Sequence, residues 1–414
     1  MDATAYITQH TPDLLALLKD LVSCDTTNPP GRNYDPITER LVAELAGAGL
    51  VARRIKVPTR LQRAALPESQ WDYPRYNVVG KRKGGGGAKK TIHFNAHYDV
   101  VPVSGRWRHQ DPFSGVAEKG WIYGRGTADM KGSIASLVLA LRALNVTGQA
   151  PLMNVEVSFT ADEETDSVLG ADWLTTHGPI KPDYAVVLEG GEGHRVCCGH
   201  NGVTWLEVVV LGKAAHGSQP DRGVNALEKM AALLLALQPY KARLAEQAFT
   251  SPEGVVMHPT VNLGGVFEQG PGGKINTVPA EARFTIDRRV LATETTVVVE
   301  RELRAELKRA AASIPGCRIQ INKISENHPC FSAPVGPFCE AMARTVTKVR
   351  RKPAVFSVSH GFNDMHFFVA HKQIPTLGWG PGGVDYHAID ERARVKDLVD
   401  AAKVYAELLT TFAG

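Results

Sequence analysis

Three adjacent acidic residues, Asp162, Glu163 and Glu164, come close behind the alternating apolar run "VEVSF". Three negative charges at the end of a predicted strand repel one another. Glu189 ends a second apolar run, "YAVVL", and a buried strand that ends in a bare carboxylate needs a cation or a cap. The sequence therefore predicts a cation near these carboxylates, while Asp162 by itself is explained by a local cap or turn.

Two histidines also lie at or shortly after predicted strand ends. The run "TIHFNAHYD" ends in His97 and Asp99, and an H-x-D spacing at a strand end points both side chains the same way, so Asp99 can orient the imidazole. His387 lies in the loop "GWGPGGVDYHAID", where a lone histidine is usually a surface residue. Taken together with the polar residues at the predicted strand ends, His387 becomes a candidate for the second nitrogen ligand of a metal ion.

A glycine-rich turn, "YGRGTADMKGS", places Asp129 immediately before a predicted long helix. Taken alone, Asp129 is better explained as a helix N-cap than as a metal ligand. The turn lacks the GxxxxGK[ST] spacing of a phosphate-binding loop. The chain also lacks the G-x-S-x-G and HExxH motifs, which argues against a serine hydrolase and a zincin.

Together these residues predict a metal site. In an open α/β sheet, ligands bind beyond the carboxyl ends of the strands. Two histidines and several carboxylates suit a pair of divalent ions with nitrogen and oxygen ligands and one bridging carboxylate, at a separation of about 3.5 to 4 Å. Zinc is the expected metal, with cobalt or manganese as alternatives.

The order of predicted helices and strands that carry these residues indicates an α/β fold. From residue 35 to about 190, helical patterns alternate with short β-rich runs, which indicates a largely parallel central sheet flanked by helices. Near residue 200 the pattern changes to three long strands and two helices, and after 320 the α/β alternation returns. We expect a discontinuous catalytic domain, 1–200 and 320–414, and an inserted α+β domain, 201–319.

Composition excludes several classes of protein. Charged residues make up 22% of the 414 residues and the formal net charge is +4, so neither disorder nor a nucleic-acid partner is indicated. The one dense basic stretch, "GKRKGGGGAKK", is interpreted as a surface hairpin. The six cysteines show no CxxC spacing. A helix is expected from near Thr11 and Pro12, and no run reaches membrane-spanning length, so a cytoplasmic protein without membrane partners is expected.

From about residue 12 to the end, the ordered motifs resemble the di-metal amidohydrolase and metallopeptidase superfamily of acetylornithine deacetylase, succinyl-diaminopimelate desuccinylase, aminoacylase and glutamate carboxypeptidase. The resemblance implies two zinc ions. It assigns His97 and Glu189 to one ion and Glu164 and His387 to the other. Asp129 would bridge both ions, and Asp99 would orient His97.

The same resemblance implies catalytic and substrate-binding roles. Glu163 would be the general base that accepts a proton from the metal-bridging water and delivers it to the leaving amine. The inserted domain resembles a lid and dimerisation domain, in which His216 stabilises the oxyanion, often from the partner subunit. Asn276 and Arg289 would bind the substrate carboxylate, although Arg289 could instead pair with Asp287.

The expected function is metal-dependent hydrolysis of the amide bond of a small N-acyl amino acid, by a homodimer joined through the lid domain. A dipeptidase or carboxypeptidase of the same superfamily is the alternative, because amide and peptide hydrolysis share one mechanism. A non-catalytic metal-binding protein is a further alternative. One departure from the resemblance is Asn363, which stands in "SHGFNDM" where relatives carry a hydroxyl residue. Because of this difference, the resemblance does not predict the pocket for the substrate side chain.

Overall fold

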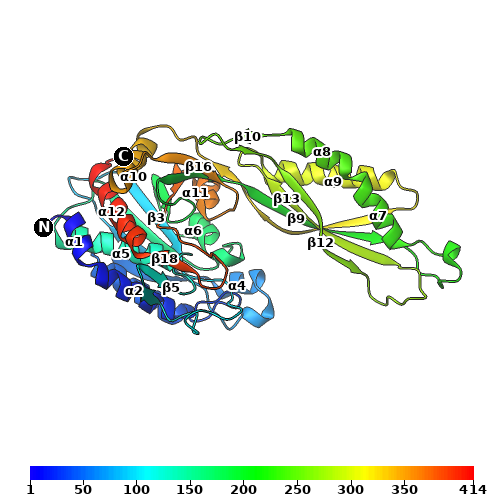
Figure 1. The fold of residues 1–414 in the computed structure, drawn as a ribbon, viewed down its shortest axis with the longest axis horizontal. Coiled ribbons are helices and arrows are strands. Elements are labelled where there is room, and N and C mark those ends of the chain that lie inside the picture. Colours follow the sequence, from blue (N-terminus) through cyan, green and yellow to red (C-terminus); the bar gives the residue numbers. More distant parts are fainter. The chain divides into compact units, whose positions relative to one another are not determined.

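The computed structural model describes residues 1–414, which form two compact units (Figure 1). The first unit comprises Met1–Gly199, Ser332–Ser357 and Asn363–Gly414. The second comprises His200–Phe331 and Val358–Phe362. The second unit extends past residue 319, where the sequence placed its end, because the strand Arg318–Asn327 spans that point and pairs within this unit.

The first unit is built on a central mixed sheet with the strand order β1-β2-β6-β3-β7-β17-β8, and β16 also pairs with β8. β6, β3, β7 and β17 run parallel to one another, whereas β1 pairs antiparallel with β2, β2 with β6, and β8 with β17. The α/β class is confirmed, and the parallel character is confined to the centre of the sheet. The bounds are β1 (Val51–Lys56), β2 (Tyr76–Arg82), β3 (Thr91–His97), β6 (Asn154–Thr160), β7 (Tyr184–Val187), β8 (Arg195–His200), β16 (Val355–Ser359) and β17 (Thr376–Gly378).

Helices cover both faces of this sheet, so its central strands are buried on both sides. Adjacent residues of β3 show the two faces: His93 packs on Phe368 of α11, and Phe94 packs on Tyr405 of α12, with ring centroids 5.2 and 5.8 Å apart. The helices of the first unit are α1 (Ala3–Gln9), α2 (Thr11–Ser23), α3 (Tyr34–Gly47), α4 (Thr59–Ala65), α5 (Lys131–Val146), α6 (Ala171–His177), α10 (Pro337–Arg350), α11 (Met365–Lys372) and α12 (Val395–Thr411).

Two local expectations can be compared with these elements. α2 begins at Thr11 with Pro12 in its first turn, as predicted. The glycine-rich basic stretch does not close a hairpin, because β6 lies between β2 and β3 in the sheet and pairs with both. The shorter elements are η1 (Glu68–Gln70), η2 (Glu163–Thr165), β15 (Cys330–Phe331) and a small sheet of β4 (Val116–Glu118), β5 (Trp121–Tyr123) and β18 (Arg392–Arg394).

The second unit is a four-stranded antiparallel sheet, in the order β12-β13-β9-β14, with three helices. β13 alternates buried and half-buried residues along its whole length, and Phe284 and Ile286 pack with Leu303 and Leu307 of α9 in one core. The sequence missed β14, whose exposed positions are mostly polar or charged. The bounds are β9 (Gly202–Leu211), η3 (Pro220–Arg222), α7 (Ala226–Ala236), α8 (Gln238–Glu246), β10 (Phe249–Thr250), β11 (Val256–Met257), β12 (Thr260–Gln269), β13 (Glu281–Val290), α9 (Thr296–Ala312) and β14 (Arg318–Asn327).

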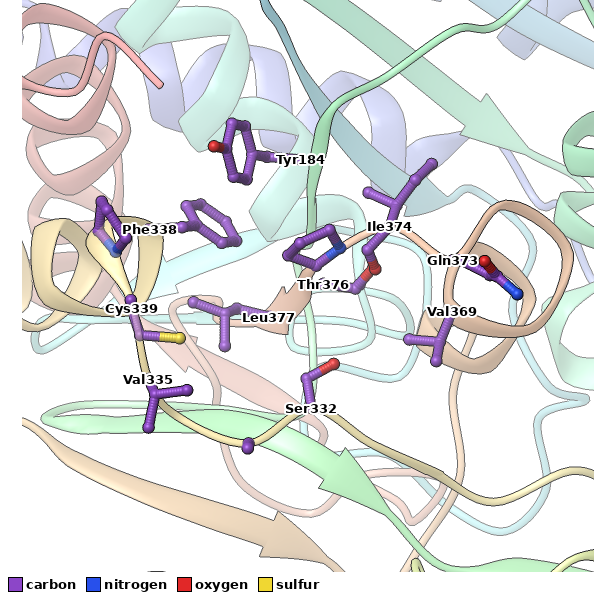
Figure 2. Close-up of a pocket in the computed structure, with 14 residues that line it drawn as sticks. Tyr184, Ser332, Val335, Phe338, Cys339, Val369, Gln373, Ile374, Thr376 and Leu377 are labelled. Atoms are coloured by element: carbon purple, nitrogen blue, oxygen red, sulfur yellow. The ribbon is translucent and has the colours of Figure 1, made fainter.

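A pocket of about 540 Å³ lies in the first unit where β7 and β17 begin (Figure 2). Tyr184, Phe338, Ile374 and Leu377 give it a mainly apolar wall. No carboxylate or imidazole lines it, and it lies at the opposite edge of the parallel strands from their carboxyl ends. None of the helices in the structure is long and apolar enough to cross a membrane.

A line of buried polar side chains runs along the α11 face of β3 and β6. His93 lies 2.7 Å from the Ser158 hydroxyl, and the Asn95 amide donates to the same hydroxyl at 3.0 Å. At the outer end, the Lys81 ammonium donates to Glu156 at 2.7 Å, and His93 lies 3.4 Å from the same carboxylate. Burial opposes the charge of Glu156, but the contacts with His93 and Lys81 outweigh it and lower its pKa to about 2.

Replacement Glu156→Gln should lower the free energy of unfolding at pH 7 by about 1 to 3 kcal/mol, because a buried charge-assisted network is broken. The folded pKa lies below the unfolded value of roughly 4.3, so this stabilisation is present above that value and is lost as the pH falls toward about 2. Urea unfolding of both proteins at several pH values measures the difference, with the exposed Glu39→Gln as control. A difference that does not change with pH would contradict this assignment.

Candidate metal centre

The parallel strands bring the predicted residues to one edge of the sheet. β3 ends at His97, which pairs with Thr160 at the end of β6, and β7 runs parallel beside β3. The acidic turn after β6 and Glu189 after β7 therefore emerge next to His97. This gathering follows from the topology, since parallel strands share one carboxyl edge.

Asp129 lies between the two candidate histidines. Its Oδ1 is 3.0 Å from Nε2 of His97, and its Oδ2 is 3.1 Å from Nε2 of His387. Nε2 of His387 is also 3.1 Å from Oε2 of Glu164. Ligand atoms of His97, Asp129 and Glu164 all lie within 4.8 Å of one another, which is close enough for one ion to contact them together. Asp129, which the resemblance implies as the bridging carboxylate, thus directs one oxygen toward each histidine.

Glu163 and Glu189 complete the cluster without a strong positive partner. Oε2 of Glu163 lies 4.0 Å from Nε2 of His97. Oε2 of Glu189 is buried and has no hydrogen-bond partner, the situation in which a carboxylate requires a cation. Burial and the charge of Glu189 raise the pKa of Glu163 well above its usual value, and burial and the charge of Asp129 do the same for Glu189. The donor set therefore fits divalent cations.

The two histidines carry the positive charge that this cluster needs. Hydrogen bonds to Asp129 and Glu164 raise the pKa of His387 to about 10. Burial opposes the charge of His97, but its contacts with Asp129 and Asp99 raise its pKa well above the usual value. Burial likewise opposes the charge of Asp129, yet the two imidazoles lower the pKa of its carboxyl. A metal ion that uses these nitrogens must displace their protons.

Asp162 is the most tightly held member of the acidic run. Its oxygens accept hydrogen bonds from Arg75 at 2.7 Å, Tyr34 at 2.9 Å and Asn28 at 3.0 Å, and both Arg75 and Asp162 are buried. Its φ of 62° starts the tight turn into Glu163. The interpretation of Asp162 as an ordinary cap or turn is therefore incomplete, because it is also half of a buried ion pair.

Asp99 fixes the same turn from the other side. Its two oxygens accept the backbone N–H groups of Glu163 and Glu164, each at 3.2 Å. Its own carbonyl oxygen lies 3.0 Å from Nδ1 of His97, closer than its carboxylate at 3.4 Å. Asn28 joins the two supports, since its amide donates to both Asp99 and Asp162. Asp99 thus contacts the ring that the sequence predicted it to orient, and it also holds the acidic turn.

The remaining candidates lie in the second unit, apart from Asn363. His216 forms a β-bridge with Thr277, and the carbonyl of Asn276 accepts the N–H of Gly217 at 2.7 Å, so His216 and Asn276 lie on adjacent segments. Arg289 forms an ion pair with Asp287 at 3.0 Å, which is the alternative that the sequence left open.

Asn363 is buried in the first unit, and its side-chain oxygen accepts the N–H of Met365 at 3.1 Å. The residue that departs from the family pattern is therefore hydrogen-bonded to the first residue of α11.

Sequence reasoning missed Arg75, Tyr34 and Asn28. No local pattern distinguishes them, because Arg75 lies 87 residues from Asp162 in the chain. Asp162 needs a positively charged partner, so a search for that partner could have pointed to a buried arginine. The sequence alone could not have identified which arginine it is.

The sequence pattern of peptidase family M20/M25/M40 matches residues 93–411. The chain belongs to this family. Succinyl-diaminopimelate desuccinylase from Cereibacter sphaeroides is 29% identical over 417 residues, covering 97% of this chain and 99% of the relative. Acetylornithine deacetylase from Vibrio atlanticus is 29% identical over 395 residues, covering 92% and 93%. These findings confirm the resemblance drawn from the motifs.

Solved structures share the fold of this M20 protein. An aminopeptidase from Bacillus cereus has a TM-score of 0.73 at 20% identity, covering 97% of this chain and 98% of that one. An M20 metallo-carboxypeptidase from Sulfolobus solfataricus has a TM-score of 0.73 at 21% identity, covering 96% and 98%. From its family and its relatives, the M20 chain is a hydrolytic enzyme that acts on amide bonds in a metal-dependent family.

Replacement Arg75→Met should lower the free energy of unfolding by about 3 to 5 kcal/mol, because it leaves Asp162 buried without its cation. The double variant Arg75→Met/Asp162→Asn should recover part of the loss, since no charge stays unpaired and asparagine tolerates the left-handed backbone. Urea unfolding measures both. Arg54→Met, which removes a surface arginine paired with Asp35, is the control and should change stability by less than about 1 kcal/mol. An equally small effect of Arg75→Met would overturn the assignment.

Proposed function

We propose that this enzyme hydrolyses the amide bond of a small N-acyl amino acid, with desuccinylation or deacetylation as the nearest reactions. The observation that carries the proposal is the strand-end cluster, in which Asp129 contacts both histidines and Glu163 lies beside them. Relatives that match nearly the whole chain have the names of two deacylases, succinyl-diaminopimelate desuccinylase and acetylornithine deacetylase.

In this proposal the cluster holds two zinc ions, with cobalt or manganese as alternatives. His97 and Glu189 would hold one ion, Glu164 and His387 the other, and Asp129 both. The unpartnered oxygen of Glu189 and the two-sided contacts of Asp129 support this assignment. When bound, the ions would supply Lewis acidity toward the amide carbonyl.

Glu163 would act as the general base. It would accept a proton from the attacking water and then give that proton to the leaving amine. Burial and neighbouring Glu189 raise its pKa, which moves a carboxylate toward the range in which it can both accept and donate near neutral pH. Asp99 would keep Glu163 in place through the backbone N–H of that residue.

The second unit would supply the remaining groups. We propose that His216 stabilises the oxyanion, and that Asn276 and Arg289 bind the substrate carboxylate. Arg289 would then have to exchange Asp287 for the substrate, which its partial exposure allows. We also propose a homodimer through this unit, supported by the edge strand β12 with its exposed Phe267.

Zinc-loaded enzyme should hydrolyse N-succinyl or N-acetyl amino acids faster than unmodified dipeptides, because the proposed substrate carries a simple acyl group where a dipeptide carries an aminoacyl group. Initial rates on a matched panel, one amino acid carrying each group in turn, measure this preference. Exhaustive chelation should abolish turnover and added zinc should restore it, because the proposed reaction needs the metal for Lewis acidity. Hydrolysis of dipeptides alone would favour a peptidase, and turnover that survives chelation would contradict a metal-dependent reaction.

Two isosteric variants separate the roles of adjacent glutamates. Glu163→Gln should retain bound zinc and lower kcat by about 100-fold to 10,000-fold, the contribution of a general base. Glu164→Gln should chiefly weaken zinc binding, because it removes a ligand oxygen. Zinc content after dialysis and kcat at saturating zinc measure the two effects, with the surface variant Glu118→Gln as control. If Glu163→Gln lost its zinc or kept normal turnover, its role as the base would be wrong.

A further inference from the structure

Glu391 is a fully buried carboxylate outside the predicted site. One of its oxygens accepts three backbone N–H groups of the Asp129 loop, from Gly126 at 3.0 Å, Ala128 at 2.9 Å and Asp129 at 3.1 Å. Neighbouring backbone N–H groups that converge on one acceptor in this way form an anion-binding nest. Here a side chain of the same protein fills the nest, four residues after His387.

The second oxygen of Glu391 extends this connection. It accepts a hydrogen bond from the buried guanidinium of Arg125 at 2.5 Å, and Arg125 also donates to the carbonyl of Ala388 at 3.2 Å. The N–H of Gly124 donates to the main-chain carbonyl of Glu391 at 2.9 Å. The loop that precedes Asp129 and the loop that follows His387 are therefore joined by side-chain and backbone hydrogen bonds.

The Asp129 loop depends on such support because its backbone is unusual. Gly126 has a φ of +88°, and a Cβ at this position would lie 2.8 Å from Val100. Three N–H groups that converge on one point cannot bond to one another, so their cost of burial must be met by one acceptor. Bonds to an ionised carboxylate are roughly twice as strong as neutral ones. The buried charge is itself offset by Arg125.

We propose that Glu391 is a positioning residue that fixes Asp129 relative to His387. The inference rests on the proposed function, in which both of those residues hold metal. Asp129 must keep one oxygen toward each histidine, and the N–H bonded to Glu391 belongs to Asp129 itself. Groups behind metal ligands orient them and typically change metal affinity by 10-fold to 100-fold when removed.

The test is a cobalt titration of metal-free enzyme, followed by visible absorption, for wild type and Glu391→Gln. A glutamine can place its oxygen in the nest, but its amide then faces Arg125 and the charge is lost. We expect the dissociation constant for Co²⁺ to rise by about 10-fold to 100-fold, with an altered spectrum, because the ligand geometry is disturbed. Kinetics at saturating metal should show a lower kcat with KM changed by less than about twofold, the pattern for a group that does not bind substrate.

Glu44→Gln is the matched control, because Glu44 is also a buried carboxylate paired with an arginine, Arg142, away from the metal cluster. It should bind Co²⁺ as wild type does. If Glu391→Gln fails to fold, Glu391→Asp replaces it, keeping the charge but withdrawing it by one methylene, and an intermediate loss of affinity is expected.

A Glu391 variant that folds and binds Co²⁺ with wild-type affinity and spectrum would overturn this inference and leave the proposed function intact. If a His387→Ala variant in the same series bound Co²⁺ with the wild-type affinity and spectrum, the proposed metal site would fail first. The two failures are therefore distinguishable in one titration series.

Discussion

The buried ion pair between Arg75 and Asp162 meets the main constraint on this structure, which is the crowding of carboxylates at one edge of a sheet. Taking several negative charges out of water is costly unless each has a partner. Arg75 neutralises Asp162, and the two histidines neutralise Asp129. Even so, burial raises the pKa of Asp162 to about 6, and burial with neighbouring carboxylates raises the pKa values of Glu163 and Glu189 well above their usual value. Glu163 and Glu189 are the groups proposed for proton transfer and metal binding.

The loops around the cluster show a second response to the same constraint. His387, Asp162 and Asp166 are non-glycine residues with left-handed φ values of 58°, 62° and 73°. Such conformations cost free energy and persist only where the surroundings hold them. Here the surroundings are hydrogen bonds from outside each loop, including those of Asp99 to the acidic turn. The candidate metal ligands and the proposed base thus lie either at strand ends or in loops that hydrogen bonds from other segments hold in place.

The sequence was most informative where function and local pattern coincide. Apolar runs that end in His97, Asp162 or Glu189 identify strand ends, and parallel strands must bring those ends together. The supports of the site could not be predicted, because Arg75 and Glu391 act on residues 87 and 262 positions away. β14 was missed for a related reason. Its exposed residues are mostly polar, so the strand is recognised only from its pairing with β9, which is distant in sequence.

The strand order has a consequence for how the chain reaches this structure. β17 lies between β7 and β8, although about 180 residues separate it from either in sequence, and both pair with it. Until that strand arrives, β7 presents an open edge in the middle of the sheet, the kind of surface that invites pairing with other chains. Non-local pairing of this sort slows folding and prolongs the exposure of such edges. Completion of the first unit during synthesis therefore waits for its last segment, Asn363–Gly414, which also carries His387 and Glu391.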